Sequence, residues 1–217
     1  MALNLGNVSV EGDDNSGRFA ISWWTLKFRD RGIEKAYARN DITKSLPLIR
    51  LTLLFATLLY GSFGVLDYYV TGSALAKVWF IRFFLVLPIF ISVVVTSFTS
   101  LFHRIPQFFL SIAMLSTGAG VVAMTAVTHE PASTHYYAGL IMVVIYGSTL
   151  VRLQFVNSAV ISLLLVAAYQ WVAIFYNPIP MTTLINNNFF LVMATVVGIF
   201  ASYIQELYVR LNYVSTR

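Results

Sequence analysis

The sequence predicts an all-α, polytopic membrane protein built as a bundle of six transmembrane helices. Hydrophobic residues make up 58% of the 217 residues and charged residues only 11%. A soluble domain is about half apolar and about a quarter charged, so this chain has too little charge to cover a water-facing surface. Six apolar segments follow one another, and the basic residues gather on one side of them. These observations predict helices that each cross ~30 Å of hydrocarbon.

Two segments precede the first span. Residues 1–17 are rich in Gly, Asn and Asp and are predicted to be disordered. Residues 18–47 mix basic and aromatic side chains, which predicts an amphipathic juxtamembrane helix lying on the membrane. The net charge of +5 favours anionic lipid, rather than nucleic acid, as the partner of so apolar a chain.

The transmembrane domain is predicted at residues 48–208, with spans at about 48–70, 78–99, 107–128, 137–155, 156–176 and 188–208. Arg152, Gln154 and Asn157 interrupt the apolar run between the fourth and fifth spans, which predicts a tight turn there. Pro88 lies inside the second span and predicts a kink.

The distribution of basic residues predicts the topology. With both termini in the cytoplasm of a cell's inner or plasma membrane, only Lys77 and Arg82 of the 14 basic residues fall on the outer side. The outer loops are short, so an external ligand would have to bind among helix ends or between helices.

Asp67 and Arg82 are the first candidates for function. A short loop joins the first two spans, so the two side chains are predicted to lie at similar depth near the outer surface. Ionisable groups inside a span are costly unless they are paired or hydrated. The pair could bind a ligand or act as a switch; a structural salt bridge, or snorkelling of both groups to the headgroups, explains it equally well.

Further polar candidates lie near the same surface. His129, Glu130, His135, Tyr136 and Tyr137 cluster on the second outer loop, but their spacing matches no known metal site and a solvated loop is favoured. Asn186, Asn187 and Asn188 open the sixth span, and one of them is expected to cap that helix. Gln170, Asn187 and Asn188 could also line an outward-facing cavity.

The last helix is predicted to continue past the membrane into the cytoplasm, with residues 209–217 beginning a linker or coiled coil to an output domain. Two patterns lie on it. Ala194, Gly198 and Ser202 form a stripe of small residues that serves either dimerisation or internal packing. The second pattern is a set of apolar residues with the spacing of a coiled coil: Ile204, Leu207, Leu211 and Val214.

The chain carries no recognisable catalytic motif. Nucleophile elbows, phosphate-binding loops and HExxH are absent, there is no cysteine, and no cofactor or metal is evident. The chain itself is therefore not expected to be an enzyme.

Several motifs resemble those of the hexahelical membrane domain of bacterial class III adenylate and guanylate cyclases and related membrane-bound signalling enzymes. The resemblance extends from about residue 23 to the end of the chain. Its matching positions are Phe28, Asp30, Glu34, Arg50, Phe63, Gly64, Asp67, Arg82, Pro88, Ser202, Tyr203, Glu206 and Arg210.

This resemblance implies a sensory and regulatory membrane domain that acts as a homodimer. Its ligand would be a small apolar molecule, a lipid or a peptide. A C-terminal cyclase domain, outside this chain, would use a nucleoside triphosphate and a divalent metal. A diguanylate cyclase or histidine kinase output, a small transporter or channel, and a passive anchor are the alternatives.

Overall fold

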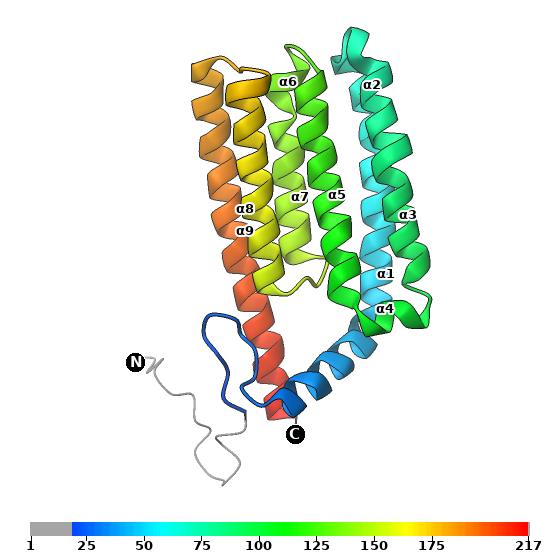
Figure 1. The fold of residues 1–217 in the computed structure, drawn as a ribbon. Coiled ribbons are helices and arrows are strands. Elements are labelled where there is room, and N and C mark those ends of the chain that lie inside the picture. The colour runs from blue at the N-terminus through cyan, green and yellow to red at the C-terminus, as the bar shows by residue number, and fades with distance from the viewer. Residues whose placement is uncertain (1–18, 217) are drawn as a thin grey trace.

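The computed structural model describes residues 19–216, and regular structure in that part of the chain is helical apart from one isolated bridge between Ile21 and Phe28. The long helices run antiparallel and form a bundle (Figure 1). We call the end of the bundle where α1 begins and α9 ends the proximal end, and the opposite end, which carries α6, the distal end.

The elements follow one another along the chain in a simple up-and-down order. Their bounds are α1 Arg31–Val70, η1 Gly72–Ala74, α2 Leu75–Trp79, η2 Phe80–Val86, α3 Leu87–Thr96, α4 Ser100–Arg104, α5 Pro106–Val127, α6 Ala132–His135, α7 Tyr137–Thr149, α8 Phe155–Trp171, η3 Val172–Tyr176 and α9 Met181–Ser215.

Five helices in residues 19–216 are long and apolar enough to cross a membrane: Arg31–Val70, Gly72–Thr96, Pro106–Val127, Phe155–Tyr176 and Met181–Ser215. The fourth predicted span differs from its expected bounds of 137–155. Its helix α7 has 13 residues and ends at Thr149, which is about 20 Å at 1.5 Å per residue. The predicted turn occupies residues 150–154, where Arg152 has a φ of +58°. A count of six membrane-spanning helices stays a prediction.

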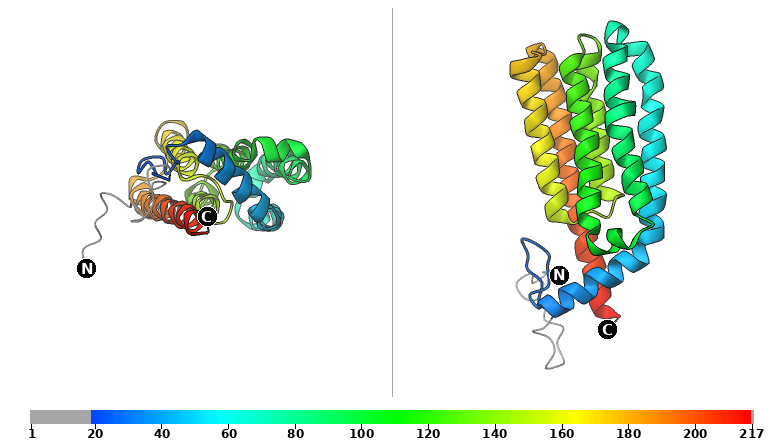
Figure 2. Two further views of the ribbon diagram at one scale, coloured as in Figure 1. Left: turned by 90° about the horizontal axis from the view of Figure 1, so that it is seen from below. Right: turned by 45° about the vertical axis from the view of Figure 1, so that its right-hand side comes forward.

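The predicted juxtamembrane helix and the first span form one continuous helix, α1, of 40 residues. Asp30 begins it, because its carboxylate accepts hydrogen bonds from the backbone N–H groups of Gly32 and Ile33. Pro47 lies inside the helix, where it removes one backbone hydrogen bond and favours a bend. The proximal half of α1 leaves the bundle obliquely and crosses beneath it to the end of α9, rather than lying beside the bundle as a separate surface helix (Figures 1 and 2).

The second span contains a π-helical segment, η2, directly before Pro88. The Leu87 N–H donates to the carbonyl of Arg82, five residues earlier. Proline has no N–H to donate, and a π-turn is one way for a helix to adjust its hydrogen bonding. The expected irregularity near Pro88 is therefore a widened turn, and Arg82 lies within it.

Helix α5 lies at the centre of the bundle and contacts η2 and α3 on one side and α7 and α8 on the other. Helix α9 packs on α7 and α8, and the bundle part of α1 packs on α3. Apolar side chains fill the interior, among them Leu53, Leu110, Met124, Leu140, Leu165 and Leu191. Large apolar side chains also cover the outside, for example Leu58, Phe84, Phe175 and Val197. Such a surface requires lipid as its solvent, so the chain is a membrane protein.

Candidate functional site

The predicted pair of Asp67 and Arg82 exists and is buried near the distal end. Asp67 lies in the last turn of α1 and Arg82 in η2, with side chains that are only 1% and 4% exposed. Arg82 Nε lies 2.6 Å from Asp67 Oδ2, and Nη2 lies 3.1 Å from Oδ1. This two-pronged geometry is the strongest that a carboxylate and a guanidinium can form.

Neighbouring groups complete the pair on all sides. Arg82 Nη1 donates to the carbonyl of Tyr60 at 3.0 Å, and its guanidinium carbon lies 4.7 Å from the centre of the Tyr60 ring. The Tyr136 hydroxyl donates to Asp67 Oδ1 at 2.9 Å. A buried charge is tolerated in a bilayer when its partners neutralise and hydrogen-bond it. The pair therefore holds α1, η2 and the start of α7 together in this conformation and does not form an open mouth for ligand.

The distal pair is linked to α9 through α6. Asn187 is 1% exposed, and its Nδ2 donates to the Thr134 carbonyl at 3.1 Å and to the Tyr169 hydroxyl at 3.2 Å. Thr134 lies in α6, two residues before Tyr136, which bonds Asp67. Gln170 and Asn188 form a side-chain hydrogen bond between α8 and α9. A continuous set of contacts thus joins Arg82 to the distal part of α9.

The remaining candidate residues at the distal end are more exposed than Asp67 and Arg82. His129, Glu130 and His135 are exposed, and Tyr137 is half-buried. His135 Nδ1 contacts the carbonyl of Pro131 at 2.6 Å. Within residues 19–216, no three His, Cys, Asp or Glu side chains gather in a way that could hold a metal ion.

The expectation that an asparagine caps the last helix is wrong. Helix α9 begins at Met181, after Pro180, so residues 186–188 lie in its second turn. Polar residues such as Thr182 and Thr183 are accommodated in the helix before the apolar run starts. Asn187 and Asn188 instead use their side chains to bind α6 and α8.

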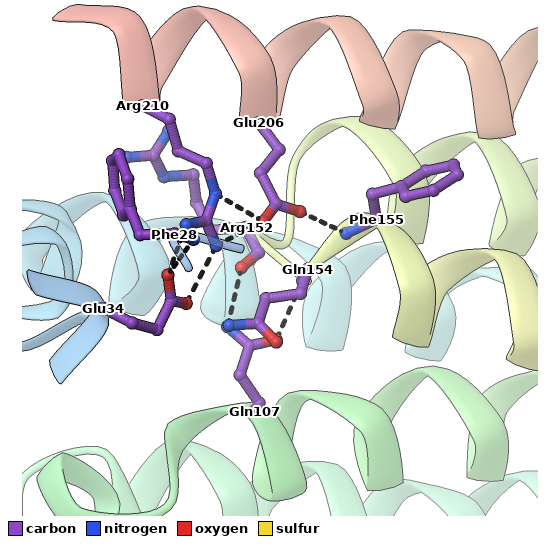
Figure 3. A network of polar contacts seen from close by, with 8 residues as sticks. All are labelled: Phe28, Glu34, Gln107, Arg152, Gln154, Phe155, Glu206 and Arg210. Atoms are coloured by element: carbon purple, nitrogen blue, oxygen red, sulfur yellow. Dashed lines mark hydrogen bonds and ion pairs between the residues drawn. The ribbon is translucent and has the colours of Figure 1, made fainter. Parts of the chain in front are cut away.

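A second network lies at the proximal end, around Arg210 of α9 (Figure 3). The Arg210 side chain is fully buried. Its Nη1 and Nη2 donate to the two carboxylate oxygens of Glu34 in α1, at 2.7 and 3.1 Å. Its Nε and Nη2 donate to Glu206 Oε1, at 2.9 and 2.8 Å. One guanidinium therefore holds two carboxylates, one from its own helix and one from the helix that crosses beneath the bundle.

Both carboxylates also accept backbone hydrogen bonds. Glu34 Oε2 accepts from the N–H of Phe28 at 2.9 Å, and Glu206 Oε2 accepts from the N–H of Phe155, the first residue of α8, at 2.6 Å. Figure 3 shows that these bonds join three segments that are distant in sequence: residues 28–34, Phe155 and residues 206–210. We call Arg210, Glu34, Glu206 and these two N–H groups the Arg210 clamp.

Aromatic rings enclose the clamp. The Arg210 guanidinium carbon lies 4.4 Å from the Tyr37 ring centre and 5.3 Å from that of Phe28, distances at which cation–π attraction contributes. Tyr213 packs on both rings. Burial alone would lower the pKa of Arg210, but hydrogen bonds and charges from Glu34 and Glu206 outweigh it and raise the pKa. The guanidinium is therefore permanently charged.

Two more contacts fix the proximal half of α1 beneath the bundle. Arg152, in the α7–α8 turn, donates through Nη2 to Asp41 Oδ1 and to the Ser45 hydroxyl, each at 2.7 Å. Arg50 donates to the carbonyl of Ser97, after α3, at 2.8 Å. A pocket of about 50 Å³ lies between α1, this turn and α9. Sites for small ligands are usually roughly 300–1,000 Å³, so this pocket is smaller than a typical ligand site.

The structure separates the two patterns on α9. Gly198 and Ser202 are buried, and a Cβ built on Gly198 would lie 3.1 Å from the Ser148 hydroxyl of α7; Ala194 is half-buried. Gly198 thus serves the packing of α9 on α7. In the second set, Ile204 and Leu211 are exposed at 45% and 41%, and Leu207 and Val214 are half-buried. Val214 packs against the aromatic cluster of Phe28, Tyr37 and Tyr213.

Sequence reasoning found the distal pair but did not assign a role to Arg210. The spacing of Glu206 and Arg210, four residues apart on one helix, is a recognisable signal for an ion pair. Glu34 lies 176 residues away from Arg210 in the sequence, so no local sequence pattern indicates that the two side chains meet. That connection depends on the bend of α1 and on the length of α9.

One family model matches this chain. The model is MASE8, a family of membrane-associated sensor domains, and it matches residues 65–216, which is more than half of the chain. The match covers the distal pair's Asp67 and Arg82 and all of α9, and it leaves out most of α1. No curated protein and no solved structure matches the chain.

Proposed function

The chain belongs to the MASE8 family of membrane-associated sensor domains, and we propose that it transmits a signal along α9 to a C-terminal enzymatic output domain. We propose that this output domain is a class III adenylate or guanylate cyclase, because the motifs of this chain resemble those in the membrane domains of such cyclases. The match to MASE8 names no output enzyme, so a diguanylate cyclase or histidine kinase is the alternative. In either case the membrane is the inner or plasma membrane, and the proximal end is cytoplasmic.

The observation that carries this proposal is the unbroken course of α9. It runs as one helix of 35 residues, or about 52 Å at 1.5 Å per residue, which exceeds the ~30 Å hydrocarbon core. Asn187 anchors its distal part to α6 and α8, and Arg210 anchors its proximal part to α1. A rigid helix that is bound at both ends can convert a change at one end into a movement at the other.

The distal network is the proposed input. Asp67, Arg82 and Tyr136 are satisfied among themselves in this conformation, so a ligand would act by favouring a second arrangement of these helices. It must bind the two arrangements with different affinities, because a ligand that binds both equally shifts nothing. A small apolar molecule, a lipid or a peptide that enters between the distal helix ends fits this requirement.

Homodimerisation is part of the proposal and is supported by the outer face of α9. Exposed apolar residues continue along this face from the bundle into the proximal extension: Phe189, Met193, Val196, Phe200, Ile204 and Leu211. Their separations of three, four or seven residues match a heptad-like seam. Lipid can cover the part inside the bilayer, and a second copy of α9 would cover Leu211 beyond it.

The test is a fusion in which the catalytic domain of a class III cyclase follows Thr216. One to four residues are then inserted at the junction, beyond the Arg210 clamp, and each residue rotates the output by about 100°. Nucleotide cyclisation in membranes should rise and fall with the helical period across the series. Cyclase activity that stays constant through all insertions would refute transmission by a rigid α9.

Placing the insertions after Tyr208 supplies a second series. These insertions separate Glu206 from Arg210 and break the clamp as well as rotating the output. If the clamp contributes to coupling, this series should lose the periodic response that the Thr216 series shows.

A further inference from the structure

A short hairpin precedes α1 and presents two tryptophans to the outside. Backbone hydrogen bonds close it, from Arg29 N to Ala20 O and from Ser22 N to Lys27 O, each at 2.9 Å. Trp23 and Trp24 lie in the turn and are 43% and 88% exposed. We call residues 20–29 the tryptophan hairpin.

The tryptophan hairpin points back toward the bundle. In Figures 1 and 2 this blue segment rises from the start of α1, on the side of the proximal part of α9, toward the proximal end of α8. The spans predicted from the sequence have their proximal ends at about residue 156 in α8 and residue 208 in α9, so the hairpin reaches toward the expected membrane boundary. Tryptophan is enriched at the boundary between hydrocarbon and headgroups, because its ring is apolar and its N–H is polar.

Charge is segregated in and after the hairpin. The three acidic residues of the segment 19–50 all bind protein groups: Asp30 caps α1, Glu34 binds Arg210, and Asp41 binds Arg152. The exposed basic residues form no ion pair with any residue in the described part of the chain; they are Lys27, Arg29, Arg31, Lys35, Arg39 and Lys44. The outward face of this segment is therefore strongly basic.

From these observations we propose that the tryptophan hairpin is a membrane-interface anchor that binds anionic phospholipid headgroups. Lys27 and Arg29 contact the headgroups, and Trp23 and Trp24 enter the boundary beside α8 and α9. Each basic residue near an anionic surface contributes ~1 kcal/mol, which is about fivefold in the ratio of bound to free hairpin.

The anchor is coupled to α9. Phe28 lies in the second arm of the hairpin. Its N–H donates to Glu34, and its ring contacts Arg210 and Tyr213. Binding of the hairpin to lipid therefore stabilises the Arg210 clamp, and an intact clamp strengthens lipid binding by the same factor. The proximal half of the molecule would respond to the anionic lipid content of its membrane. This inference rests on the proximal placement of the hairpin next to the bilayer and not on the identity of the output enzyme.

The experiment uses the full chain with Trp79→Phe and Trp171→Phe, which leaves Trp23 and Trp24 as its only tryptophans. The protein is placed in nanodiscs of phosphatidylcholine or of an equal mixture with phosphatidylglycerol, and brominated lipids quench the tryptophan emission. Both faces of a nanodisc are open, so the result does not depend on the orientation in a cell or on the proposed sensory function. We expect stronger quenching with phosphatidylglycerol, and its reversal by high salt.

Two variants make the test specific. Lys27→Gln with Arg29→Gln should lower the ratio of bound to free hairpin roughly 25-fold, at about fivefold for each charge. Lys77→Gln, which removes an exposed charge at the distal end, should have no effect. Equal quenching in the two lipid mixtures, or quenching that the Lys27 and Arg29 variant leaves unchanged, would overturn the proposal. A shift of tryptophan emission caused by a soluble oligonucleotide, but not by phosphatidylglycerol, would also overturn it and would assign the surface to nucleic acid.

Discussion

Replacing Glu34 by Gln removes the contact that joins α1 to α9 at the proximal end. Glu34 accepts two hydrogen bonds from Arg210 and one from Phe28 N. Glutamine keeps one acceptor oxygen, but it loses the negative charge and turns an N–H₂ group toward the guanidinium. Arg210 keeps Glu206 as a partner, so the whole protein should stay folded while the proximal half of α1 is held less firmly.

The size of the effect follows from the geometry. Hydrogen bonds between charged groups contribute about 1.5–3 kcal/mol each, but the Glu34 side chain is 19% exposed and water compensates part of the loss. A net loss of about 2–3 kcal/mol raises the equilibrium constant for detachment of this segment roughly 30- to 150-fold. Backbone amides of residues 31–42 should exchange with deuterium faster by this factor when exchange proceeds through local opening.

Hydrogen–deuterium exchange in nanodiscs measures this directly. Glu130→Gln is the matched control, because Glu130 is exposed at the distal end and forms no ion pair with any described residue. A double-mutant cycle with Arg210→Gln adds a second check. Glu34→Gln should have little further effect once Arg210 is gone, because the two residues act as one contact. Unchanged exchange in residues 31–42 of Glu34→Gln would show that the clamp does not hold α1.

Two further substitutions test the distal end and the packing of α9. Tyr136→Phe removes the hydroxyl that donates to buried Asp67 and should cost about 1–2 kcal/mol, seen as a lower melting temperature in detergent, whereas Tyr137→Phe should change it little. Gly198→Leu forces a side chain against α7 and should cost about 1–3 kcal/mol. Gly61→Leu is the control, because a Cβ at Gly61 meets no atom within 4 Å; it should be neutral or stabilising. Equal melting temperatures for Gly198→Leu and Gly61→Leu would contradict the close packing of α9 on α7.

Local sequence patterns were sufficient to place Asp67 and Arg82 at similar depth. Asp67 and Arg82 lie on either side of a short connection between antiparallel helices, so their depth is determined by their distance from the turn. An unpaired charge is costly in a bilayer, but snorkelling of both groups to the headgroups remained an alternative to pairing. The structure shows that the two groups are paired. The contribution of Tyr136 was not predictable in the same way, because α6 interrupts the chain before α7 and sets where the hydroxyl points.

At the proximal end, the partner of the apolar face before the first span could not be predicted from the sequence. The apolar residues Phe28, Tyr37 and Ile42 predict an amphipathic helix, and a membrane surface is the obvious partner for an isolated one. In the structure Phe28 and Tyr37 pack on α9 instead. Periodicity shows which face of a helix is apolar, but it does not show what covers that face. The direction of the bend in α1 decides this, and it depends on contacts such as that of Asp41 with Arg152.

The two networks together restrict how a signal can pass through α9. A helix that packs closely along α7, with Gly198 against Ser148, cannot bend freely in its middle, so a change at Asn187 must shift or rotate it as a unit. The same movement displaces Arg210 relative to Glu34, which belongs to a different helix, but not relative to Glu206, which moves with α9. In the proposed transmission, such a movement must therefore strain or exchange the bonds between Arg210 and Glu34, and also the bond from Phe155 N to Glu206.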